Sequence, residues 1–337
     1  MDIDELARKV IAYLRNNNVL KGKPAFENRT SELVCVDPRG YWDEYYGVYP
    51  YWQQKEIETH QKDFEEIDSQ LRRLDFDQLQ EQALNEIPDS GNTAIIELGS
   101  EYGEKGAGYL AKYKPSAKVI LISKKWKETK PFEFLFTESN RIKHKLAFNA
   151  GKHLLNEQDL EKRINGLYRI NGINNVTFHE HELALSETDN LPDFLNNLYE
   201  KDIYFFGHMA PTILPFLMGR LYNSLNAKYM CVSLTAVEKI KPEEFVWNIV
   251  QRNLNLSDEE LKGYIESAHD PIAANNPGSL SDKYDYDNPE QERIGVMIKL
   301  GIALALAKEV NGEVLRNNNP EFRIGYNKID HYVEARR

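Results

Sequence analysis

The chain has 337 residues, of which 41% are hydrophobic, and a formal net charge of -11. This length can bury the core of a full α/β domain and still carry a smaller appendage, while the negative charge argues against nucleic-acid binding over the whole surface. Only two cysteines occur, Cys35 and Cys231, in unlike contexts. Their number and separation exclude a disulfide framework or a cysteine metal site.

The first 92 residues predict a helical N-terminal cap. Residues 2–16 read as a short amphipathic helix with acids in its first turn, unlike a signal peptide, and residues 53–84 as a long polar helical run. No apolar run is long enough to cross a bilayer, so we expect a cytoplasmic protein with no membrane partner.

An aromatic loop lies between these two helical runs. Seven of its twelve residues, 41–52, are aromatic. Such a cluster can close over a planar substrate, in which case Tyr45 and Trp52 are its contacts, or it can be the core that fastens the cap to the main domain. The sequence leaves both roles open.

From residue 93 the pattern changes to short β-type runs that alternate with helical ones. The runs are 93–98, 118–123, 175–180, 202–207 and 228–234. Strands separated by helix-length crossovers predict an α/β domain over 93–337, with a doubly wound, mainly parallel sheet.

The end of the chain predicts an insertion, a helix and an antiparallel pair. Residues 255–288 are polar and rich in Pro, Asn, Gly and Asp in their second half, which indicates an insertion. A helix follows and should stop at Asn311 and Gly312. Two last strand-like runs are joined by a short turn, so the sheet should end in an antiparallel C-terminal hairpin.

The stretch "AIIELGSEYGEKGAG" (94–108) has the strand, glycine turn and helix of a nucleotide site. A dinucleotide loop has a glycine two positions after Gly99, where this chain has Glu101, and a carboxylate there repels a pyrophosphate. S-adenosylmethionine (SAM) carries a positive sulfur and no phosphate, so it remains compatible with the loop. A structural turn in another α/β protein is the alternative.

This element order, together with "IIELGSEYG", resembles the class I SAM-dependent methyltransferases, whose first strand ends in an acid and enters a glycine loop. The resemblance implies a Rossmann-like fold, SAM as cofactor, Glu97 near the methionine moiety and the "HEHE" at 179–182 near the adenine. The cofactor-binding candidates are Glu97, Gly99, Ser100, Gly103, Ser123, Lys124, His179, Glu180 and Gly207.

Two blocks, "DIYFFGHMAPTILPFL" and "QERIGVMIKLGIALA", also resemble the tRNA acceptor-stem 2′-O-methyltransferases and their relatives, without the His-x-Cys-Gly type signature of that group. Another departure concerns the second strand, which ends in Ser123 and Lys124 where the superfamily has an acid for the ribose hydroxyls. Losing that acceptor weakens binding by one or two strong hydrogen bonds, roughly 1.5–3 kcal/mol each.

His208 follows the fourth strand of the α/β pattern, at the edge where open α/β sheets bind ligands. An imidazole there can take a proton from a hydroxyl or amine, so His208 is the catalytic candidate, with a buried structural histidine as the alternative. The two histidines of "HEHE" lie on one side of a strand, which supplies too few ligands for zinc, so we expect no metal.

Residues 112–152 are basic: eleven Lys or Arg face three Glu, a net charge of +8, and the rest of the chain carries -19. The stretch is either a solvated face or a surface for an anion or RNA, with Arg141 and Lys143 as contacts.

From these features together, we expect a SAM-dependent methyltransferase for an oxygen or nitrogen of a small or peptide-like substrate. The alternatives are an RNA methyltransferase, a catalytically silent binding or assembly protein of the same fold, and a transferase of the aminocarboxypropyl arm of SAM.

Overall fold

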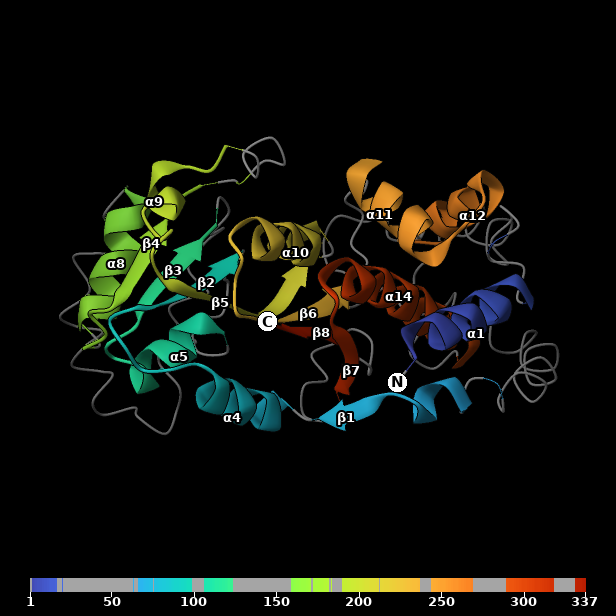
Figure 1. Ribbon diagram of the computed structural model, residues 1–337, viewed down its shortest axis with the longest axis horizontal. Coiled ribbons are helices and arrows are strands. Elements are labelled where there is room, and N and C mark those ends of the chain that lie inside the picture. Colours follow the sequence, from blue (N-terminus) through green and yellow to red (C-terminus); the bar gives the residue numbers. More distant parts are fainter. Residues whose placement is uncertain are drawn as a thin grey trace, which may run out of the picture. The chain divides into compact units, whose positions relative to one another are not determined.

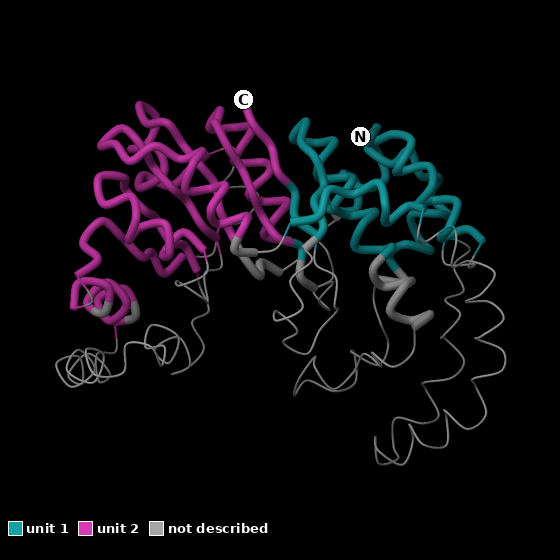
Figure 2. Tube along the Cα trace, turned by 90° about the horizontal axis from the view of Figure 1, so that it is seen from below, with its two compact units in different colours: residues 1–75, 211–213, 234–333 teal, residues 76–210, 214–233, 334–337 magenta. Residues whose placement is uncertain are grey.

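A computed structural model describes fourteen parts of the chain. These are residues 2–16, 20, 63, 66–74, 76–98, 106–123, 159–170, 172–181, 183, 190–211, 213–236, 244–268, 289–317 and 331–337. The chain divides into two compact units (Figure 2). Unit 1 holds residues 1–75, 211–213 and 234–333, and unit 2 holds residues 76–210, 214–233 and 334–337.

Unit 2 contains the parallel strands that the α/β pattern predicts. They are β2 (Thr93–Leu98), β3 (Lys118–Ile122), β4 (Val176–His179) and β5 (Asp202–Pro211), whose last residue belongs to unit 1. Strand β2 pairs in parallel with β3 on one side and with β5 on the other, and β3 pairs in parallel with β4. All six residues of β2 are buried, as expected for a parallel strand covered on both faces.

Among the described residues, the hydrogen-bonded strand order is β1-β7-β8-β6-β5-β2-β3-β4. It includes β1 (Arg72–Leu74), β6 (Tyr229–Ala236), β7 (Glu313–Asn317) and β8 (His331–Arg336). The order reverses between β2 and β5, which makes the sheet doubly wound. Strand β8 runs antiparallel to β6, since the N–H of Arg337 just after β8 donates to the carbonyl of Lys228 just before β6 at 2.9 Å. This confirms the predicted fold class, a doubly wound, mainly parallel α/β sheet with an antiparallel strand from the C-terminus.

Helices flank the strands of unit 2 (Figure 1). They are α4 (Phe76–Glu86), α5 (Ala107–Tyr113), α8 (Leu160–Ile170), α9 (Asp193–Asn196) and α10 (Ile213–Ser224), whose first residue belongs to unit 1. Helix α5 packs on β2 and β3, and α8 packs on β4. The side chain of Asn165 in α8 pairs with both backbone polar groups of Phe178 at 2.7 and 3.1 Å. This pairing covers part of the outer edge of β4 as another strand would.

In unit 1, helices α1 (Ile3–Asn16), α11 (Glu244–Leu254) and α12 (Asp258–Ala268) pack against the long helix α14 (Pro289–Val310) (Figure 1). Helix α1 begins where Asp2 accepts the backbone N–H of Asp4 at 2.9 Å, as an N-cap does. Helix α14 ends at the predicted stop, since Asn311 has φ 53° and the N–H of Gly312 donates to the carbonyl of Ala307 at 2.7 Å.

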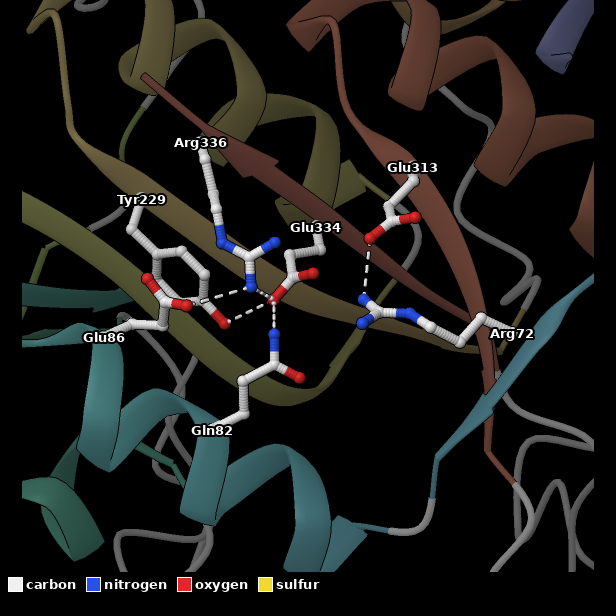
Figure 3. A network of polar contacts seen from close by, with 7 residues as sticks. All are labelled: Arg72, Gln82, Glu86, Tyr229, Glu313, Glu334 and Arg336. Atoms are coloured by element: carbon white, nitrogen blue, oxygen red, sulfur yellow. Dashed lines mark hydrogen bonds and ion pairs between the residues drawn. The ribbon is translucent and has the colours of Figure 1, made fainter. Parts of the chain in front are cut away.

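A polar network in unit 2 joins α4 to strands β6 and β8 (Figure 3). The carboxylate of Glu334 is 1% exposed and accepts hydrogen bonds from Gln82 at 2.6 Å, Tyr229 at 3.0 Å and Arg336 at 3.0 Å. Arg336 also pairs with Glu86 at 3.2 Å. These donors compensate the burial of the Glu334 charge and fix α4 to the sheet.

The N-terminal region differs from its prediction in one respect. The run at 53–84 was expected to be one helix, but strand β1 interrupts it at residues 72–74 and α4 follows. Strand β1 pairs in parallel with β7, and Arg72 forms an ion pair with Glu313 at 2.7 Å, both within unit 1 (Figure 3). The boundary of the N-terminal cap at residue 92 stays a prediction. Within the described ranges, no helix has the length and apolar character that crossing a membrane requires.

Candidate functional site

The carboxyl ends of β2, β3 and β4 lie next to one another in unit 2. Leu98 is in register with Ile122, and Ile122 with His179. The backbone N–H of Ser123 donates to the carbonyl oxygen of His179 at 3.1 Å, which continues the pairing one residue beyond β3. Because neighbouring strands lie about 4.8 Å apart, Glu97, Ser123 and His179 follow each other along one edge of the sheet.

Glu97 is the acid at the end of β2, and its side chain is only 2% exposed. Its Oε2 accepts the backbone N–H of Ala107, the first residue of α5, at 2.6 Å. A Cβ atom at Gly106 would overlap the Glu97 carboxylate, so this position requires glycine as long as the acid stays where it is. The acid therefore fixes the point at which the chain returns from residues 99–105 into a helix.

Gly207 of β5 also lies next to Glu97. A Cβ atom at Gly207 would sit 3.8 Å from Cγ of Glu97 and 3.4 Å from Cε of Met218 in α10. The structure thus brings two of the predicted cofactor residues, Glu97 and Gly207, side by side. His208 is the next residue of β5, but its side chain is outside the described part, so its catalytic role stays a prediction.

Ser123 is 8% exposed and follows directly after β3. It occupies the position between Glu97 and His179 along the edge, where the resemblance places the ribose. A hydroxyl there can donate one hydrogen bond and accept others but is uncharged, whereas a carboxylate accepts charge-assisted hydrogen bonds from two ribose hydroxyls at once. Ser123 therefore retains part of the hydrogen bonding expected at this position and lacks the charge.

The side chain of His179, the last residue of β4, lies against residues of two helices. Its ring stacks on Phe194 of α9, with centroids 4.2 Å apart and planes 14° apart, and its Nδ1 lies 3.9 Å from a carboxylate oxygen of Glu161 in α8. Burial lowers the pKa of His179 below 6.5, with further lowering by Lys118 and His181, and the Glu161 charge opposes the shift. His179 is consequently neutral at pH 7.

Two residues beyond β4, His181 contacts the same phenyl ring edge-on, with centroids 5.7 Å apart. Both histidine side chains therefore lie on the side of β4 where Phe194 packs, as the alternation of side chains along a strand predicts. The Glu180 side chain is exposed, and its backbone N–H donates to Glu161 at 2.8 Å. Sequence reasoning missed Glu161 and Phe194 because they come from helices whose packing on β4 no local pattern reveals.

The remaining predicted site residues lie outside the described part of the chain. They are Tyr45, Trp52, Gly99, Ser100, Gly103, Lys124, Arg141 and Lys143. Their roles, including those of the aromatic loop and of most of the basic stretch, stay predictions. Across the residues that are described, no three His, Cys, Asp or Glu side chains are grouped so that they could hold a metal ion.

Comparison with known proteins adds little to this geometry. No family model matches the chain, and no curated protein matches it either. Among solved structures, the chain is similar to coclaurine N-methyltransferase bound to N-methylheliamine and S-adenosylhomocysteine (SAH), with a TM-score of 0.29 and 10% identity over 98% of this chain and 100% of that one. Because this TM-score is low, the class of the fold rests on the strand order alone.

Proposed function

We propose that the protein is a cytoplasmic SAM-dependent methyltransferase acting on an oxygen or nitrogen of a small or peptide-like substrate. The observation that carries the proposal is Glu97, a buried carboxylate at the carboxyl end of β2 that holds the N-terminus of α5. Gly106 and Gly207 both lie against this side chain, since a Cβ atom at either position would come within 4 Å of Glu97. Ligands of doubly wound sheets bind at this edge, next to the point where the strand order reverses.

The residues present fit SAM better than a phosphate-bearing cofactor. SAM is a cation at its sulfur and at its amino group, and the charge of Glu97 attracts both. Ser123 offers a hydroxyl to the ribose, and His179 with Phe194 offers flat apolar surface next to it. The same carboxylate would repel a pyrophosphate, which argues against a dinucleotide.

When bound, SAM would supply an electrophilic methyl group. The chain's own contribution would be to position the substrate and to exclude water, since methyl transfer in line needs little further chemistry. His208 would accept the proton of the attacking hydroxyl or amine. Tyr45 and Trp52 of the aromatic loop would enclose a small substrate, and we favour such a substrate over RNA because of the -19 charge outside residues 112–152.

Calorimetric titration with SAH tests the proposal without knowledge of the substrate. Wild-type protein should bind SAH, and Ser123→Asp should bind it at least about tenfold more tightly, because a carboxylate adds one strong hydrogen bond to the ribose. Gly91→Asp is the matched control: it adds the same charge at the amino end of β2, where a side chain meets no atom within 4 Å. Its affinity should equal that of wild type.

An absence of binding heat at millimolar SAH would refute the enzymatic proposal and favour a catalytically silent binding or assembly protein. Weaker binding in a folded Ser123→Asp protein would show that the ribose lies elsewhere. Mass spectrometry of any product separates transfer of a methyl group from transfer of the aminocarboxypropyl arm.

A further inference from the structure

His179 lies two strands from Glu97, about 10 Å along the carboxyl edge of the sheet. A nucleoside ligand whose amino-acid end is at Glu97 and whose ribose is at Ser123 reaches His179 with its base. What His179 can offer to that base depends on which ring nitrogen carries the proton. Neutral imidazole has one donor nitrogen and one acceptor nitrogen, and the two tautomers prefer opposite partners.

Glu161 decides between the tautomers. The carboxylate oxygen nearest to His179 faces Nδ1 at 3.9 Å, and an ionised carboxylate can only accept hydrogen bonds. The same oxygen is held in place by the backbone N–H of Glu180 at 2.8 Å. The stacked Phe194 ring holds the plane of the imidazole. A proton on Nδ1 therefore faces an acceptor, whereas a lone pair there would face negative charge.

On the basis of the proposed function, we propose that Glu161 is a positioning residue that keeps the His179 proton on Nδ1. Nε2 of His179 then accepts a hydrogen bond from the exocyclic amine of a purine ligand. This makes Glu161 a determinant of base specificity. A 6-amino purine presents a donor to Nε2, and a 6-oxo purine presents an acceptor, which an imidazole lone pair repels.

The charges around His179 agree with a neutral ring. Lys118 of β3 and His181 act on it together with Glu161, and burial is the largest influence, so the pKa of His179 stays below its ordinary value. The imidazole thus keeps a lone pair for an amine at neutral pH. Protonation in acid would turn Nε2 into a donor and remove the preference.

The test compares SAH with its deaminated analogue, in which a ring carbonyl replaces the amine. Wild-type protein should prefer SAH by about tenfold or more, the size of one matched hydrogen bond to a base. In Glu161→Leu no acceptor faces Nδ1, so neither tautomer is favoured by this side chain and the preference should fall toward unity. Asp159→Asn, which removes a carboxylate charge just before the same helix, is the control and should keep the wild-type ratio.

Nitrogen NMR of the His179 ring supplies a readout without ligand. The Nδ1–H form should dominate in wild type, and Glu161→Leu should shift the tautomer balance and lower the pKa of His179 further. An Nε2–H form in wild type would overturn the inference. So would an unchanged SAH preference in Glu161→Leu, and in that case the proposed function stands. If wild type binds neither nucleoside, the proposed function fails, and the inference fails with it.

Discussion

Mild acid should destabilise unit 1 through a single histidine. His331 begins β8 with its side chain 1% exposed, and its neighbours include Lys299 of α14 and Arg316 of β7. Burial together with these two positive charges lowers the pKa of His331 from 6.5 to about 3. The folded protein therefore holds this imidazole neutral over a pH range in which the unfolded chain protonates it.

The size of the effect follows from linkage between protonation and folding. The folded pKa lies below the unfolded value of 6.5, so the stabilising contribution of a neutral His331 is complete above about pH 6.5 and is lost as the pH falls toward 3. At pH 5 the folded ring is still neutral, while about 97% of unfolded chains carry the proton. The free energy of unfolding should thus be about 2 kcal/mol lower at pH 5 than at pH 7 from this group alone.

Urea unfolding at both pH values measures the difference, with His331→Gln as the reference. The variant has no imidazole at this position, so the remaining histidines and the carboxylates contribute equally to both proteins. Wild type should lose about 2 kcal/mol more than His331→Gln between pH 7 and pH 5. Equal losses in the two proteins would refute the reasoning and would show that His331 is solvated or paired with an acid in solution.

Three further substitutions test other parts of the structure. Gly301→Ala should cost about 1–3 kcal/mol in thermal unfolding, because its Cβ would overlap the Tyr264 hydroxyl, and the cost should shrink in a Tyr264→Phe background, which a double-mutant cycle measures. Tyr229→Phe should cost about 2 kcal/mol in urea unfolding, since the buried Glu334 carboxylate loses a donor; an unchanged midpoint would contradict this. Glu97→Gln keeps an acceptor for α5, so it should retain most stability but lose SAH affinity by calorimetry; unchanged affinity would assign Glu97 to the fold alone.

The strands were predictable because each is a short buried run with a clear end. Residues 93–98 match β2 exactly, and the runs at 118–123 and 175–180 match β3 and β4 to within one residue at either end. Burial on both faces removes the alternation of polar residues, so the apolar letters alone mark such a strand. The stop of α14 was equally local, because Asn and Gly tolerate the left-handed backbone that ends a helix.

Strand β1 and the partners of His179 were not predictable in the same way. Only three residues form β1, two of them arginines with exposed side chains, and their strand conformation comes from pairing with β7, about 240 positions away. Glu161 and Phe194 come from helices α8 and α9, and only the packing of those helices brings them to His179. Contacts between distant segments leave no periodic signal in one sequence.

Glu97 fits either a ligand site or a plain structural turn, and both interpretations start from the same geometry. Its side chain is 2% exposed and accepts a hydrogen bond from the N–H of Ala107, the first residue of α5, at 2.6 Å. A buried carboxylate is tolerated where hydrogen bonds compensate its lost hydration, so this contact alone is compatible with a structural role. The Glu97→Gln variant separates the two interpretations, because a purely structural acid leaves SAH affinity unchanged whereas a ligand contact loses it.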